Sequence, residues 1–328
     1  MDHRINRRNF LSAAAIGAGT LMSAPAAFAH DAFGDVVFEE KFARLEKVGE
    51  NVWAVVSKPL DDNGQFNPET LCNGGLIAGK DRIVAIDAFY TPEGAAWLSS
   101  IAKEMLGRPI TDVILTHFHA DHSAGTAGYQ TGASGPDIIA TETTRQLIYE
   151  RYASPAREIE GTPFKAPAFK PVLPNRILTD ETTKVQIDLG DRTLTLDPKK
   201  GHTPSDLAIH VDDDPVIFAG DLVWAGFFHN YVDAIPSHLS TSVRDLLRDP
   251  KQTIVTGHGY VAKAGILGDY VSLLDLVEEK AKAAHSAGLS ATEGAKTFVV
   301  PESLGDWFLF GANYYVTAFN AWYRELDA

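Results

Sequence analysis

Short apolar runs separated by glycine, asparagine and aspartate recur along most of the chain and predict a series of β-strands. Two stretches of helical periodicity lie among them: one helix is expected from the cap residue Thr91 to Gly107, and a second over residues 141–152. Strands that alternate with helices in this way indicate a layered α/β fold. The expected strands span residues 42–48, 52–56, 75–78, 82–87, 110–116, 138–140, 184–189, 193–196, 206–211, 216–219 and 253–256.

After the last expected strand the pattern becomes helical. Apolar residues recur at helical spacing over residues 266–281, with charged residues on the opposite face. A short helix from Ser290 and a terminal helix over residues 311–326 follow, so residues 263–328 are predicted to form a helical extension. Its aromatic side chains are expected to pack the last helix onto the body rather than to bind a ligand: Tyr314, Tyr315, Phe319 and Trp322.

Two segments lack regular periodicity. Residues 58–72 are polar and contain two prolines and a glycine, which suits either a mobile flap over a site or plain surface. Residues 155–174 contain five prolines, which excludes regular structure and suggests a connection that wraps between two halves of the molecule. Substrate specificity is expected to depend on the loops at 58–72 and 155–175, whose composition names no ligand.

The first 29 residues have the pattern of an export signal. A basic region ends at Arg7 and Arg8, an apolar stretch spans residues 11–21, and small residues precede His30. Paired arginines followed by Phe-Leu resemble a twin-arginine signal, so the Tat export machinery is an expected partner. We expect cleavage after Ala29 and a mature protein in the bacterial periplasm or outside the cell. An uncleaved anchor is the alternative, and no later stretch is long and apolar enough to span a bilayer.

The charge balance argues against one class of partner. The chain carries 29 Lys and Arg against 43 Asp and Glu, a formal net charge of −14. Loss of residues 1–29 removes three arginines and one aspartate, which brings the net charge to −16. Nucleic acid requires a basic face, so it is not an expected partner. The single cysteine, Cys72, cannot form an internal disulfide and is expected to be a small buried side chain.

A dense group of potential metal ligands directly follows the apolar run at residues 113–115. Imidazole nitrogens and carboxylate oxygens are ligands that suit zinc, and a bound zinc can hold a hydroxide at neutral pH. Three histidines and one aspartate within six residues favour a metal centre over the surface decoration that a single His-x-His would suggest. They are His117, His119, Asp121 and His122.

Three further residues share the placement of this group: His202, Asp221 and His258. Each is expected in a glycine-containing turn just past the carboxyl end of an apolar strand, and such ends converge on one edge of a layered sheet. Taken singly, a turn histidine or a helix cap would be the simpler interpretation, but together with the first group they favour ligands. His229 and Tyr231 follow Asp221 closely enough to be weaker candidates for contact with substrate.

The ordered set His117-x-His119-x-Asp121-His122, then His202, Asp221 and His258, resembles the metallo-β-lactamase superfamily of zinc hydrolases over roughly residues 40–260. The resemblance implies an α/β fold, a four-layer αββα sandwich that we assign to residues 30–262. It also implies that His117, His119 and His202 hold one zinc. Asp121, His122 and His258 would hold a second, with Asp221 bridging both. Iron or manganese replaces zinc in some relatives, and the sequence does not exclude them.

The same resemblance implies the reaction. A hydroxide held by two zinc ions would attack the carbonyl of a cyclic amide, an ester or lactone, or a thioester. Asp121 would act both as a ligand and as the group that orients the nucleophile. The net positive charge of such a centre favours a small anionic substrate.

The flanking sequence narrows the branch of the superfamily. The resemblance implies Cys or Ser at this place in the secreted β-lactamase branches, so aspartate at position 221 argues against them. It matches the glyoxalase II-like, lactonase-like and general-hydrolase branches. The stretch 222–228 lacks the Gly-Cys-Gly-Arg-like pattern of glyoxalase II, and the flanks look more like exported hydrolases. The alternatives are a β-lactamase proper, a mononuclear iron dioxygenase acting on sulfur species, and a metal-binding periplasmic protein without catalysis.

Overall fold

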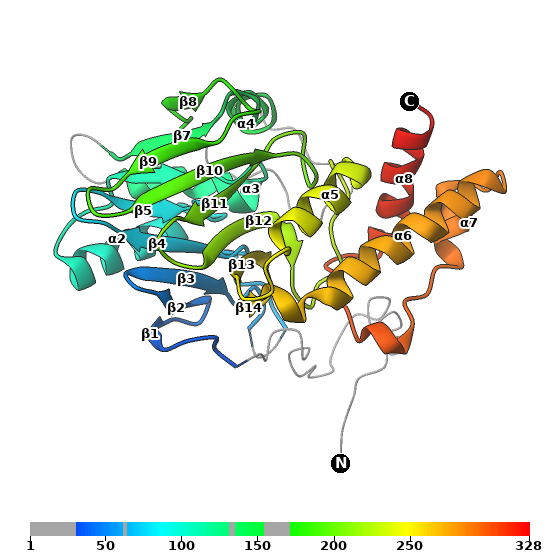
Figure 1. Cartoon of the computed structure of the whole chain (residues 1–328), viewed down its shortest axis with the longest axis horizontal. Coiled ribbons are helices and arrows are strands. Elements are labelled where there is room, and N and C mark those ends of the chain that lie inside the picture. Colours follow the sequence, from blue (N-terminus) through cyan, green and yellow to red (C-terminus); the bar gives the residue numbers. More distant parts are fainter. Residues whose placement is uncertain (1–30, 62–63, 131–134, 154–170) are drawn as a thin grey trace, which may run out of the picture.

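Two mixed β-sheets face each other at the centre of the molecule and are covered by helices on their outer faces (Figure 1). The computed structural model describes residues 31–61, 64–130, 135–153 and 171–328. The predicted signal at 1–29 and most of the proline-rich segment at 155–174 lie outside this part of the chain. Within it, no helix combines the length and hydropathy needed to cross a membrane.

The first sheet has eight strands in sequence order, antiparallel from β1 to β5 and parallel from β5 to β8. The sequence predicted its central strands but missed the two edge strands, β1 and β8, which are only four and three residues long. Short edge strands limit unwanted pairing with other chains. The bounds are β1 Val36–Glu39, β2 Ala43–Gly49, β3 Val52–Ser57, β4 Gly74–Ala78, β5 Ile83–Ile86, β6 Asp112–Ile114, β7 Asp137–Thr141 and β8 Arg176–Leu178.

The second sheet has six strands in the order β14-β13-β12-β11-β10-β9, and only β12 and β13 run parallel. Both predicted hairpins, β9–β10 and β11–β12, are present. The bounds are β9 Val185–Asp188, β10 Thr193–Lys199, β11 Asp206–Val211, β12 Val216–Trp224, β13 Thr253–His258 and β14 Ala262–Lys263.

Three apolar cores separate four layers. Inward-facing side chains of both sheets, such as Ile114 and Phe218, form the central core. A second core lies between the first sheet and the helix α2 (Pro92–Leu106), which begins at the predicted cap Thr91 and ends before Gly107 at φ 70°. The third core lies between the second sheet and the C-terminal helices. The αββα sandwich expected from the sequence is therefore confirmed.

The helical extension lies beside the β12 end of the second sheet (Figure 1) and shares an apolar core with β12 and the helix α5 (Pro236–Leu246). It consists of α6 Gly268–Ser286, α7 Ala291–Lys296 and α8 Tyr314–Leu326, with short 3-10 turns at Ala264–Ile266 and Glu302–Leu304. The predicted start at Ser290 is a capping box with Glu293. The sequence missed α5, which packs against α6, because its first turns are rich in serine and threonine. Its buried positions Leu239, Val243 and Leu246 do follow helical spacing.

The second predicted helix at 141–152 is shorter and changes character. A regular α-helix, α4, spans Glu142–Ile148 and is capped by Thr141, whose side chain accepts a hydrogen bond from the Thr144 amide. It continues as a π-helical turn over Tyr149–Ala153. Such turns occur often at functional sites because they displace side chains from the regular helical positions. This one carries Arg151 and Tyr152 toward the site described next.

Candidate metal centre

Four separate segments deliver the predicted ligands to one place. His117 and His119 lie in the loop after β6, and Asp121 and His122 follow in the one-turn helix α3 (Ala120–Ser123). The others arrive from the second sheet. His202 comes three residues after β10, and His258 is the last residue of β13.

The placement predicted for Asp221 is wrong in one respect. It does not lie in a turn past a strand, because β12 continues through it to Trp224. The pairing of β12 with β13 is irregular on both sides of Gly220, whose φ of +49° is a left-handed conformation that favours glycine. A side chain at position 220 would also lie 2.8 Å from the Thr116 Cβ. Glycine here therefore lets the strand bend so that Asp221 turns into the site.

The first ligand group consists of His117, His119, His202 and Asp221. His119 Nδ1 lies 3.1 Å from His117 Nε2 and 2.8 Å from His202 Nε2. The Asp221 Oδ2 atom is 3.2 Å from His202 Nε2 and 3.8 Å from His117 Nε2. Three ring nitrogens and a carboxylate oxygen thus face a common point.

The second ligand group consists of Asp121, His122 and His258. The His258 Nε2 atom lies 3.3 Å from Asp121 Oδ2, and His122 Nε2 is 3.8 Å from the same oxygen. Asp221 reaches this group too, since its Oδ1 is 3.0 Å from His122 Nε2 and its Oδ2 is 3.4 Å from His258 Nε2. The Asp221 carboxylate therefore lies within 3.4 Å of ring nitrogens from both groups.

Buried polar atoms without hydrogen bonds indicate that these residues fit a metal ion. Two atoms at the centre, His122 Nε2 and Asp221 Oδ1, are buried and make no hydrogen bond within the described structure. Buried polar atoms without a partner are costly, and a cation between them removes that cost. The donor set of imidazoles and carboxylates suits zinc, iron or manganese.

Electrostatics keep His117, His202 and Asp221 in the forms that bind metals. Burial lowers the pKa of His117 and of His202 well below the ordinary value, so both imidazoles are neutral at pH 7. Burial alone would raise the pKa of Asp221, but attraction to His258, His122 and His202 holds it well below its usual range. Neutral imidazole and ionised carboxylate are the ligating states. Burial lowers the pKa of His122 and His258, but the carboxylates around them outweigh it and raise both above the ordinary value, so these two imidazoles would release a proton when a cation binds.

Asp87 is a buried aspartate that was not among the predicted site residues. Its contacts hold the ligand side chains in place. Asp87 Oδ2 lies 2.7 Å from His122 Nδ1, and the Thr116 amide and hydroxyl both donate to its carboxylate. The Thr116 hydroxyl also lies 3.0 Å from His117 Nδ1. A carboxylate behind a ligating histidine fixes the tautomer and the ring orientation. Asp87 follows β5 at φ 63°, so its position at a strand end was the available signal.

Asp233 and Arg151 support His119 in the same way. The Asp233 Oδ2 atom lies 2.9 Å from His119 Nε2. Arg151 donates to both oxygens of Asp233, at 3.2 and 2.6 Å, while its guanidinium lies 4.7 Å from the Phe118 ring centroid. Burial opposes ionisation of Asp233, but His119 and Arg151 outweigh it and hold its pKa well below the usual range. The carboxylate therefore keeps His119 Nε2 protonated and leaves Nδ1 free to ligate.

We expect Asp233→Asn to weaken metal binding about 10- to 100-fold, because an amide no longer fixes the His119 tautomer. Competition with a chelator of known affinity measures the change. Asp245→Asn is the matched control, since Asp245 pairs with Lys199 at 2.8 Å and with Arg248 at 2.6 Å away from the ligands. Equal metal affinity in the two variants would show that Asp233 does not position His119.

His229 and Tyr231 are not placed for the substrate contact that the sequence suggested. His229 is fully buried behind His202, with its Nε2 3.1 Å from His202 Nδ1 and its Nδ1 2.9 Å from the Tyr270 hydroxyl. Tyr231 is also buried and packs against the His229 ring. Their position fits support of a ligand rather than contact with a substrate.

Cys72 is buried beneath the second ligand group. Its thiol donates to the Asp121 carbonyl oxygen at 2.8 Å. Burial raises the pKa of the thiol to about 12, so it stays protonated at neutral pH. The expectation of a small buried side chain is confirmed.

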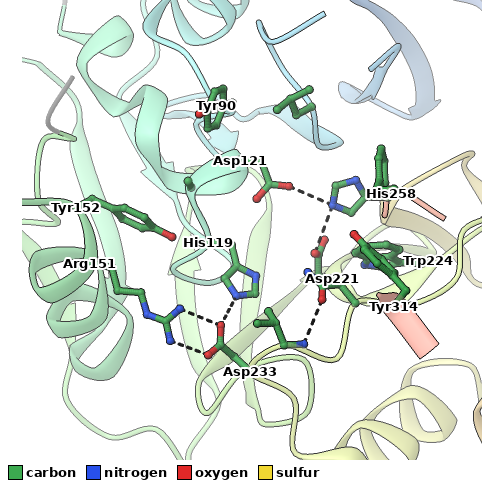
Figure 2. A pocket seen from close by; sticks show the side chains of 15 residues that line it. Tyr90, His119, Asp121, Arg151, Tyr152, Asp221, Trp224, Asp233, His258 and Tyr314 are labelled. Atoms are coloured by element: carbon green, nitrogen blue, oxygen red, sulfur yellow. Dashed lines mark hydrogen bonds and ion pairs between the residues drawn. The ribbon is translucent and has the colours of Figure 1, made fainter. Parts of the chain in front are cut away.

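A pocket opens directly above both ligand groups (Figure 2). It has a volume of about 80 Å³ and is partly open to solvent, so it can take a small group next to the ligands. His119, Asp121, Asp221 and His258 reach its floor, and Arg151 lies at one side. The walls are largely aromatic and apolar: Leu71, Tyr90, Tyr152, Trp224, Val232, Phe310 and Tyr314.

The aromatic side chains of α8 pack onto the body as expected: Phe319 and Trp322 are buried, and Tyr314 and Tyr315 pack against the third core. Tyr314 also lines the pocket, as does Phe310 from the segment before the helix. The sequence offered no signal for this, because helical spacing tells which side chains share a face but not what that face contacts.

Comparison with known proteins identifies the group to which this site belongs. A family model described as the metallo-beta-lactamase superfamily matches residues 67–258, which include every predicted ligand. The chain belongs to the metallo-β-lactamase superfamily. The enzyme class expected from the sequence, a hydrolase of this superfamily, is thereby confirmed.

The chain is distantly similar to several individual members of the superfamily. "Metallo-beta-lactamase type 2" of Bacillus sp. (strain 170) is 25% identical over 238 residues, covering 70% of this chain and 81% of that protein. Human "Acyl-coenzyme A thioesterase MBLAC2" is 25% identical over 280 residues, covering 75% and 91%. The structure of a metallo-beta-lactamase from Pontibacter korlensis matches with a TM-score of 0.57 and 21% identity, covering 71% and 99%. At these identities the substrate does not transfer from a relative to this superfamily member.

Proposed function

We propose that the chain is a dinuclear zinc-dependent hydrolase that cleaves the acyl bond of an ester, lactone, thioester or cyclic amide. The observation that carries the proposal is the position of Asp221, whose two oxygens contact His122 and His258 on one side and His202 on the other. A single buried carboxylate between two ligand groups fits two cations better than one. The relatives named as a β-lactamase and as an acyl-coenzyme A thioesterase support an acyl substrate.

The metal ions, when bound, would supply Lewis acidity toward a carbonyl oxygen and lower the pKa of water. His117, His119 and His202 would hold one ion, and Asp121, His122 and His258 the other, with Asp221 shared. This division follows the two ligand groups.

Asp121 has the position of a residue that acts on the attacking water. Its side chain is 24% exposed, whereas Asp221 and the His202 and His122 ligands are almost fully buried, and it lines the pocket. Burial by itself would raise its pKa, but His122 and His258 hold the pKa below the ordinary value, so the carboxylate is ionised and can accept a proton. In the net reaction water adds OH to the acyl carbon and H to the leaving group. The bond from the acyl carbon to oxygen, sulfur or nitrogen breaks.

Metal analysis combined with turnover on one preparation tests this function. We expect two metal ions per chain and hydrolysis of at least one of three probes: nitrocefin, a thioester and a lactone. Chelation should abolish the turnover, and added zinc should restore it. No turnover on a broad panel by protein with two bound ions would contradict a hydrolase. One iron per chain with oxygen uptake would identify the dioxygenase alternative.

The N-terminal sequence supports export as a further part of the proposal. Residues 1–29 fit a twin-arginine signal, and protein prepared from a periplasmic extract should then begin at His30. N-terminal sequencing of that protein gives the cleavage site. A start at Met1 in the membrane fraction would instead indicate the uncleaved anchor.

A further inference from the structure

The segment between α7 and α8 folds back against the chain that follows Asp221. Phe308 forms a parallel bridge with Phe227, in which the Phe308 amide donates to the Gly226 carbonyl oxygen at 2.9 Å. The Phe228 amide donates in turn to the Phe308 carbonyl oxygen at 2.8 Å. Two backbone hydrogen bonds thus fix the position of this segment relative to the end of β12.

This pairing brings Phe310 to the rim of the metal centre. Its ring stacks on Phe227, with centroids 5.1 Å apart and an interplanar angle of 22°. It also lies 5.7 Å from the His258 ring and 6.3 Å from Trp224. The side chain is held by aromatic contacts on several sides, so it forms a fixed wall of the pocket and not a loose cover.

Tyr314, the first residue of α8, lies next to this wall. It lines the pocket together with Asp121, Asp221 and His258 (Figure 2). No hydrogen bond to its hydroxyl is formed by any residue in the described part of the chain. Tyr129, Tyr270 and Tyr323 differ in this respect, since each donates its hydroxyl hydrogen to a backbone carbonyl oxygen.

A tyrosine phenol is protonated at neutral pH, so the Tyr314 hydroxyl can donate a hydrogen bond. Tyr314 is half-buried at the pocket wall, where a polar group is expected to find a hydrogen-bond partner. For a donor that faces an open pocket, that partner is a ligand or water.

We propose that Tyr314 is a substrate-binding residue of the metal centre, donating a hydrogen bond to the carbonyl or carboxylate oxygen of an acyl ligand whose apolar group packs on Phe310 and Trp224. The C-terminal extension thus contributes to the active site as well as to the third core. This inference rests on the proposed acyl hydrolase function, and it assigns one contact within it.

The test compares Tyr314→Phe with Tyr323→Phe. Both changes remove one hydroxyl from the same helix, but the Tyr323 hydroxyl donates to the Leu289 carbonyl oxygen at 3.0 Å, away from the pocket. Two quantities are measured on zinc-loaded protein: kcat/KM for the p-nitrophenyl ester of phenylacetic acid, and the Kd of phenylacetate by calorimetry. Metal content and thermal unfolding are recorded for each variant.

Tyr314→Phe should lower kcat/KM about 10- to 100-fold and weaken phenylacetate binding about 10-fold, because a hydrogen bond to a charged oxygen is lost. Tyr323→Phe should leave both quantities within twofold of the original protein, with metal content equal in all three. Equal kinetics and equal phenylacetate binding in the two variants would overturn the inference. If the original protein hydrolyses none of the probes, the hydrolase proposal fails, while the phenylacetate titration still decides the role of Tyr314.

Discussion

Asp221→Ala should remove most of the activity and most of the second metal ion in one step. The side chain contacts both ligand groups, at 3.0 Å from His122 Nε2 and 3.2 Å from His202 Nε2. Its removal takes away the only carboxylate of the first ligand group and a neighbour of the second. We expect turnover to fall at least about 10³-fold, since a Lewis acid contributes several kcal/mol and each 1.36 kcal/mol is tenfold in rate.

Elemental analysis and steady-state kinetics on the same sample check this result. Asp212→Ala is the control, because that aspartate lies exposed in the turn between β11 and β12. The variant should remain folded, which circular dichroism records. Full activity with a single metal per chain would show that Asp221 does not bridge two ions.

Gly257→Ala should disrupt the centre although it replaces no ligand. A Cβ at this position would lie 2.0 Å from Asp221 Oδ1 and 2.7 Å from the Gly220 carbonyl atoms. The clash is partly with backbone, so β12 and β13 must separate at the point where they deliver Asp221 and His258. Overpacking of this kind costs about 1–3 kcal/mol, and the displaced carboxylate should reduce the metal content as well.

Gly268→Ala is the matched control for this change. Gly268 begins α6, and nothing lies within 4 Å of the position that its Cβ would occupy. Metal content should stay unchanged there, and the free energy of unfolding in urea should be equal to that of the original protein or higher by up to about 1 kcal/mol. The explanation fails if the Gly257 variant binds two ions and unfolds at the same urea concentration as the original protein.

The ligands could be predicted from the sequence because each lies at or near the carboxyl end of an apolar strand, and strand ends meet at one edge of a sandwich. His202 lies past its strand as predicted, whereas His258 is still the last residue of β13. Asp221 was found by the same rule although its strand does not end there. Gly220 at positive φ bends β12 where the sequence predicted the strand to end. Asp221 therefore reaches the other ligands as predicted, although its local structure was predicted wrongly.

The supporting and pocket residues could not be predicted in the same way. Asp233 meets His119 across 114 positions of sequence, and its partner Arg151 comes from a π-helical turn that a periodic pattern does not reveal. Tyr314 resembled a packing residue because an aromatic side chain on an amphipathic helix usually is one. The contacts between distant elements depend on how the sheets and helices pack in all three cores, so no single stretch of sequence reveals them.

The pairing of Phe308 with the end of β12 holds the segment before α8 at the pocket, although this segment lies outside the stretch that supplies the predicted ligands. Every predicted metal ligand lies between positions 117 and 258, whereas Phe310 and Tyr314 line the pocket from the later part of the chain. We expect substitutions in this later part to change which molecules bind while the predicted ligand set stays intact. Directed evolution toward a new substrate would do well to begin there.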